Sequence, residues 1–89
     1  MKLELVLVQE AILSFIAELS GFKGNDVISI KFQNLFAKIN SRKKNFSQET
    51  FKTILSIMAQ TQDHIKKGPV QVAIIRKNLN QILTILKNA

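Results

Sequence analysis

The chain has 89 residues, 46% of them hydrophobic, with three glycines, one proline, no cysteine and a formal net charge of +7. This length suffices for one domain with a single core, and the lack of cysteine excludes disulfides and thiolate-bound metals. The scarcity of glycine and proline favours a few long helices. We therefore expect one all-α domain spanning residues 1–89.

Residues 3–19 are predicted to form the first helix, because apolar side chains recur on one face while Glu4, Ser14 and Glu18 lie on the other. The apolar set comprises Leu5, Val8, Ile12, Phe15, Ile16 and Leu19. Although the opening KLELVLV alternates like a strand, no second strand is available to pair with it. The glycines that follow then end the helix.

The start of the chain is not expected to be a signal peptide, because Glu4, Gln9 and Glu10 interrupt its apolar residues and no convincing cleavage site follows. No stretch reaches the roughly eighteen uninterrupted apolar residues that a membrane-spanning helix needs. Both observations predict a soluble, cytoplasmic protein.

Asp26 is predicted to be the N-cap of a second helix that runs to about Asn40. Its apolar stripe consists of Ile28, Phe32, Leu35, Phe36 and Ile39. The residues expected to face water are Lys31, Gln33, Asn34 and Lys38. Residues 40–45, with the sequence NSRKKN, have turn formers at both ends and three consecutive cations, which indicates an exposed connection.

Ser47 is predicted to cap a third helix, with Glu49 in the first turn, where the helix dipole favours an anion. Phe46 and Phe51 occupy the two positions of a hydrophobic staple around this cap. The apolar stripe of the helix consists of Phe51, Ile54, Leu55, Met58 and Ile65. These signals together predict a well-defined helix start.

Gly68 is predicted to follow the last turn of the third helix, and Pro69 to block its continuation and to open a fourth helix. The stripe of the fourth helix consists of Val72, Ile75, Leu79, Ile82, Leu83 and Leu86. Four amphipathic helices with short connections predict an antiparallel four-helix bundle.

The residues offer little catalytic chemistry. His64 is the only histidine, and the six acidic residues form no pair at i, i+3 or i, i+4 spacing. Near the end of the third helix, His64 is expected to be a solvated residue favoured by the dipole. No glycine-rich phosphate loop is present. We therefore expect no enzymatic activity, no cofactor and no metal site.

The excess positive charge lies in the second half of the chain, because residues 1–38 have as many acidic as basic residues. Such a surface attracts nucleic acid, anionic lipid or an acidic protein. The candidate partner-binding residues are Arg42, Lys43, Lys44, Lys66, Lys67, Arg76, Lys77 and Lys87. If the bundle brings them together they would form a nucleic-acid footprint, and if not they simply keep an apolar bundle soluble. Without exposed aromatic residues or a recognition helix, we favour a protein partner.

The first and fourth helices carry more apolar residues than one core requires. The additional residues are Val6, Leu7 and Leu13 in the first helix and Val70, Ile74 and Ile85 in the fourth. They either cover the edges of neighbouring helices or form a docking strip for a partner or a second copy of the chain. A structural or assembly subunit is therefore a further hypothesis.

These features together resemble the bacteriocin immunity proteins of lactic acid bacteria and streptococci, in particular the enterocin A immunity family of pediocin-like bacteriocin immunity proteins. The similarity covers most of the chain and rests on four periodic segments, QEAILSFIAELSG, FQNLFAKINSRKKN, FSQETFKTILSIMAQ and RKNLNQILTILKN. Members of that family are small, basic, cysteine-poor four-helix bundles of the cytosol.

The resemblance implies that the chain protects a producer cell from a pore-forming bacteriocin. It would do so by binding, from the cytosolic side, a membrane receptor that carries the bacteriocin, namely a sugar phosphotransferase permease. Family specificity is attributed to the C-terminal half, which points here to residues 66–69 and to Arg76, Lys77 and Lys87. The basic half would also lie near the anionic inner face of the membrane. A small basic nucleic-acid-binding or regulatory protein is the alternative, and a homodimer is a further possibility.

Overall fold

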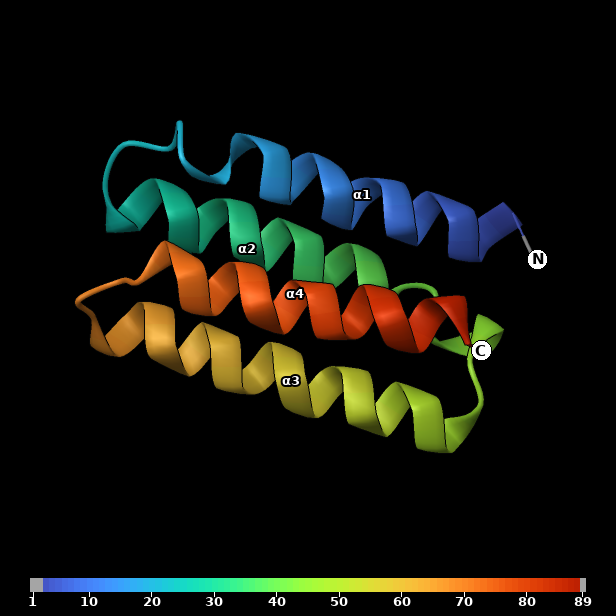
Figure 1. The fold of residues 1–89 in the computed structure, drawn as a ribbon. Helices are drawn as coiled ribbons and strands as arrows, with labels where there is room; N and C mark the ends of the chain where they lie inside the picture. Colours follow the sequence, from blue (N-terminus) through green and yellow to red (C-terminus); the bar gives the residue numbers. More distant parts are fainter. Residues whose placement is uncertain (1–2, 89) are drawn as a thin grey trace.

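The computed structural model describes residues 3–88 and folds them into an antiparallel bundle of four helices (Figure 1). The helices are α1 (Leu3–Leu19), α2 (Asn25–Asn40), α3 (Gln48–Lys67) and α4 (Val72–Lys87), with a short 3-10 segment, η1 (Lys43–Asn45), between α2 and α3. The predicted fold class is thereby confirmed. Residues 1, 2 and 89 of the predicted domain lie outside the described part of the chain.

Each helix packs beside its neighbour in sequence, and α4 returns to pack beside α1. The Cα trace extends 35 × 21 × 20 Å. Because successive helices run in opposite directions, their connections alternate between the two ends of the bundle (Figure 1). We call the end with residues 41–47 and the last turn of α4 the η1 end. The end with residues 20–24 and 68–71 is called the Gly68 end.

The predicted apolar stripes meet in one core. Its buried residues are Leu5, Val8, Ile12, Phe15 and Leu19 of α1, Ile28, Phe32, Leu35 and Ile39 of α2, Ile54, Met58 and Ile65 of α3, and Ile75, Leu79, Ile82, Leu83 and Leu86 of α4. The half-buried stripe residues that pack against this core are Ile16, Phe36, Phe51 and Val72. Leu55 of the predicted α3 stripe is half-buried outside the core. Phe15 and Phe32 join α1 to α2 by an edge-to-face contact with ring centroids 5.9 Å apart. Among residues 3–88, Thr61 is the only buried polar residue, and the predicted stripe of α3 did not include it.

The N-terminus of α3 confirms the predicted cap and staple. The Ser47 hydroxyl accepts a hydrogen bond of 3.2 Å from the Thr50 amide, which satisfies one of the amides left unpaired at a helix start. The rings of Phe46 and Phe51 stack with their centroids 5.9 Å apart. Glu49 lies in the first turn, as expected. These contacts fix the direction in which the chain enters α3.

The predicted N-cap of α2 is wrong. Gly24 is the N-cap, with a φ of 93°, and no side chain caps the helix by a hydrogen bond. This backbone conformation is accessible almost only to glycine, so the chain turns into the helix before it reaches Asp26. Asp26 lies instead in the first turn, where its charge still complements the helix dipole.

The predicted start of the fourth helix at Pro69 is also wrong, because α4 begins at Val72 with Gln71 as its N-cap. The Gln71 amide donates a hydrogen bond of 3.0 Å to Nε2 of His64, which anchors the connection to the last turn of α3. The Gln71 carbonyl accepts the first backbone hydrogen bonds of α4. Residues 68–71 are therefore a separate connection that reverses the chain.

Candidate functional site

The structure divides the eight predicted partner-binding residues between the two ends of the bundle (Figure 1). The η1 end carries Arg42, Lys43, Lys44 and Lys87, and the last turn of α3 and first two turns of α4, toward the Gly68 end, carry Lys66, Lys67, Arg76 and Lys77. Because antiparallel helices send successive connections to opposite ends, the cations of residues 42–44 and those of residues 66–77 are separated along the molecule, whose Cα trace is 35 Å long. They do not form one continuous footprint.

At the η1 end, Arg42 is held against the C-terminus of α2. Its Nη1 atom lies 3.3 Å from the Lys38 carbonyl oxygen and 3.3 Å from the Ser41 hydroxyl, and donates a hydrogen bond to each. The same carbonyl also accepts the Ser41 hydroxyl at 2.7 Å, and a cation at this position complements the helix dipole. Lys43 and Lys44 follow in η1 with exposed side chains. The predicted exposed connection is therefore confirmed, with a short 3-10 turn at its centre.

At the Gly68 end, Lys67 forms an ion pair of 3.1 Å with Asp63, one turn earlier on α3. Both side chains are exposed, so the pair adds little stability. The expectation that His64 is merely solvated is wrong. The ring of His64 is half-buried, and its Nε2 accepts the Gln71 amide. This hydrogen bond fixes the loop between the two predicted pairs of cations.

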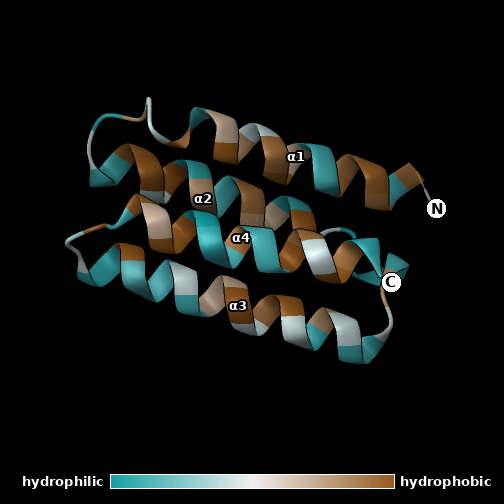
Figure 2. Ribbon diagram, viewed as in Figure 1, coloured by the Kyte–Doolittle hydropathy of each residue, from teal (hydrophilic) through white to brown (hydrophobic). Residues whose placement is uncertain are grey.

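Beyond the loop, Arg76 and Lys77 line a shallow depression on the outward side of α4. The other residues lining it are Ala73, Asn80, Gln81 and Thr84. Five of the six lining residues are polar, and Figure 2 shows hydrophilic bands alternating with hydrophobic ones along α4. The depression is open to solvent and is not an enclosed pocket.

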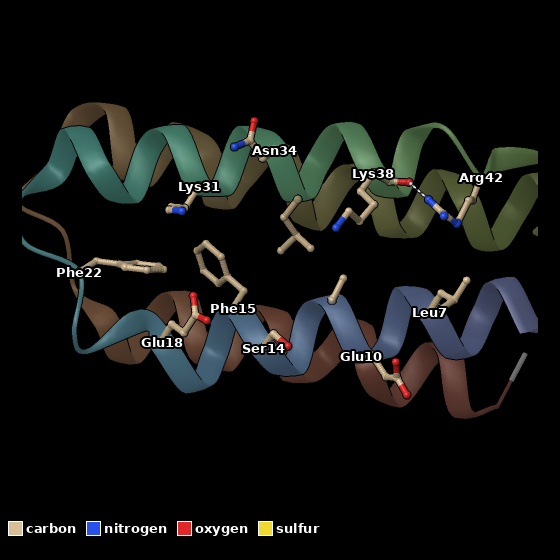
Figure 3. A pocket seen from close by; sticks show the side chains of 12 residues that line it. Leu7, Glu10, Ser14, Phe15, Glu18, Phe22, Lys31, Asn34, Lys38 and Arg42 are labelled. Atoms are coloured by element: carbon tan, nitrogen blue, oxygen red, sulfur yellow. Dashed lines mark hydrogen bonds between the residues drawn. The ribbon is translucent and has the colours of Figure 1, made fainter.

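A groove between α1 and α2 was not predicted from the sequence. Apolar side chains of Leu7, Ala11, Phe15, Phe22 and Leu35 form part of its lining. Figure 3 shows two rows of polar residues across the groove from one another. Glu18, Ser14 and Glu10 belong to α1, and Lys31, Asn34 and Lys38 belong to α2.

The two walls of the groove carry opposite charge. Glu10 and Glu18 make the α1 wall acidic, whereas Lys31 and Lys38 make the α2 wall basic. All four side chains are exposed, and among residues 3–88 none of them forms an ion pair. The sequence had indicated that Glu18, Lys31 and Lys38 face water. Their alignment in two oppositely charged rows depends on how α1 and α2 pack.

The exposed apolar surface lies on the same two helices. The large hydrophobic residues that remain exposed between residues 3 and 88 are Leu3, Leu7 and Leu13 of α1 and Val27 and Ile30 of α2. The expected excess on the first helix is therefore confirmed for Leu7 and Leu13. For the predicted fourth helix the outcome differs, because Val70, which lies in the connection before α4, and Ile85 of α4 both pack against the core. Ile74 is half-buried, so α4 presents no exposed apolar strip in the described chain.

Within residues 3–88, no group of three histidine, aspartate or glutamate residues is placed to hold a metal ion. No described helix is both long and apolar enough to cross a membrane. Comparison with family models, with curated proteins and with solved structures gives no match. The family resemblance therefore stays a prediction.

Proposed function

We propose that this chain is a bacteriocin immunity protein. It protects the producer cell by binding, from the cytosolic side, a sugar phosphotransferase permease to which the pore-forming peptide is already bound. The observation that carries this proposal is the antiparallel four-helix bundle, which is the fold that the family resemblance implies. A bundle with cations at both ends suits recognition of a partner better than it suits catalysis.

The best candidate for the contact surface is the Gly68 end. Lys66 and Lys67 stand at the end of α3, and Arg76 and Lys77 stand near the start of α4. The hydrogen bond between Gln71 and His64 holds the loop between them in one conformation, so little conformational entropy would be lost on binding. Near an anionic inner leaflet, each cation would contribute on the order of 1 kcal/mol.

Survival of a bacteriocin-sensitive strain that expresses the chain tests the proposal. A panel of pore-forming peptides should be used, including any peptide encoded beside the gene, and at least one should lose its activity. Neutralising the Gly68 end in the variant K66Q/K67Q/R76Q/K77Q should abolish that protection. The matched control R42Q/K43Q/K44Q/K87Q removes as many cations from the η1 end and should keep it. No protection against any peptide would refute the proposal.

The η1 end favours a second candidate function, namely binding of nucleic acid. Arg42, Lys43 and Lys44 are consecutive, and the last turn of α4 adds Lys87 at the same end. Four phosphate contacts would reduce the affinity for duplex DNA about 100-fold between 50 and 200 mM salt. Titration of duplex DNA at these two salt concentrations measures the slope. No binding at the lower salt concentration would exclude this function.

A further inference from the structure

We propose that the face formed by α1 and α2 is the interface of a symmetric homodimer, in which α1 of each copy packs on α2 of the other. The face carries the groove and its two oppositely charged walls, and Leu7 is an exposed apolar residue of the groove lining. This inference does not depend on the proposed immunity function, because it concerns a different surface from the Gly68 end.

At each height along the groove, a residue of the α1 wall lies opposite a residue of the α2 wall. We call such a height a level. Figure 3 shows Glu18 opposite Lys31 and Glu10 opposite Lys38. Between these charged levels, Ser14 lies opposite Asn34. The match arises because α2 runs antiparallel to α1 and both helices rise by the same distance per residue.

The proposed two-fold axis lies between the faces of the two copies and runs parallel to the helices. With this axis, residues that lie opposite one another within one copy meet across the interface. Such an axis places α1 of one copy on α2 of the other and keeps each residue at its own level. Glu18 then meets Lys31 of the second copy, and Glu10 meets its Lys38. Symmetry repeats both contacts, giving four ion pairs, as expected for an isologous interface.

The charges also select this arrangement over its alternative. A two-fold axis running across the helices would place α1 on α1, so that Glu10 and Glu18 of the two copies would face each other. Like charges at close range disfavour that dimer. The rows of charge therefore specify the orientation of the second copy, although each exposed ion pair contributes little to affinity.

Apolar contacts complete the interface at both ends of the groove. Leu7, which is 41% exposed, lines the groove near the η1 end, and Val27, which is 38% exposed, lies in the first turn of α2 at the Gly68 end. In the proposed dimer, Leu7 covers the aliphatic stem of the second copy's Arg42, and Phe22 comes close to its Val27. Both helices are about 25 Å long. Because only two helices form the face, we expect a small interface and weak association.

Sedimentation velocity on the full chain, from about 10 µM to about 1 mM at low salt, measures the association directly. The sedimentation coefficient should rise with concentration from the monomer value toward the dimer value. Raising the salt concentration should weaken the association, because the four ion pairs are exposed. A monomer at every concentration would overturn the proposal.

Charge reversal identifies the face. The variants E10K/E18K and K31E/K38E should each lose self-association, because one makes both walls basic and the other makes both walls acidic. An equimolar mixture of the two should associate again. The matched control K52E/K77E reverses two cations on α3 and α4 and should associate like the original chain. All these side chains are exposed, so the helical circular dichroism should be unchanged. Unchanged self-association of E10K/E18K, or no association in the mixture, would overturn the proposal.

Discussion

The side-chain amide of Asn78 donates a hydrogen bond of 2.9 Å to the hydroxyl of Thr61, and so links α4 to α3. The Thr61 hydroxyl in turn donates to the Ile57 carbonyl at 2.7 Å. Thr61 is completely buried, and no buried side-chain polar atom in the described chain lacks a partner. A polar link of this kind stabilises one register of two helices, because a shifted register would leave the half-buried Asn78 amide without its acceptor.

Removing one member of this pair should destabilise the bundle. Thr61→Val keeps the shape of the side chain but leaves the half-buried Asn78 amide without its acceptor, so we expect a loss of about 1–2 kcal/mol. Asn78→Ala should cost about 1 kcal/mol, because the Thr61 hydroxyl still donates to Ile57. Urea denaturation of both single variants and the double variant gives the coupling energy. Strictly additive effects would show that the two side chains do not interact.

The hydrogen bond that caps α3 leads to a second prediction. Ser47→Ala should lower the free energy of unfolding by about 1 kcal/mol, because the Thr50 amide loses its acceptor. Ser56→Ala is the matched control, since Ser56 is exposed in the middle of the same helix and alanine is the better helix former there. Thermal and urea denaturation should separate the two variants. Equal effects would mean that the Ser47 hydroxyl has no capping role.

The turn before α2 allows a comparison between two glycines. Gly24→Ala should destabilise the bundle by about 1–3 kcal/mol, because its φ of 93° is unfavourable for any residue with a Cβ. No atom lies within 4 Å of the added Cβ, so the cost comes from the backbone alone. Gly21→Ala, where no positive φ is required, should be neutral or slightly stabilising. Denaturant titration measures both, and a harmless Gly24→Ala would contradict the described turn.

The His64 hydrogen bond predicts which ring nitrogen carries the proton. Because Nε2 accepts the Gln71 amide, the proton of the neutral ring must be on Nδ1. Nitrogen NMR of the imidazole should detect this tautomer. His64→Ala should increase the hydrogen-exchange rate of the Gln71 amide while leaving the helix centres protected. An unchanged exchange rate would show that His64 does not hold the loop.

The sequence predicts most of the fold because the four apolar stripes are long and regular. The exception in α3 is instructive: Ile54, Met58 and Ile65 are buried, and Thr61 occupies the position that continues their spacing. A stripe defined by hydrophobicity alone omits a threonine whose hydroxyl is satisfied inside the core. The spacing of its neighbours was the signal that could have identified it.

The binding surfaces were less predictable, because they depend on which residues the packing brings together. Counting charge along the sequence indicates a basic half, but the antiparallel connections place Arg42 and Lys66 near opposite ends. In the same way, Glu18 and Lys31 are predicted to be exposed, yet their alignment requires the relative register of α1 and α2. The two helix starts that were predicted wrongly lie at loops. One start depends on the backbone conformation of the loop, and the other on a hydrogen-bond acceptor that is distant in sequence.

Leu3 at the start of α1 and Lys87 at the end of α4 lie at the same end of the bundle, since these neighbouring helices are antiparallel (Figure 1). A short linker could therefore join them, and new termini could be opened between Gly21 and Gly24 without cutting a helix. Such a circular permutant would keep every interhelical contact while changing the order in which the helices are synthesised. The architecture thus depends on how the four helices pack, and not on where the polypeptide is interrupted.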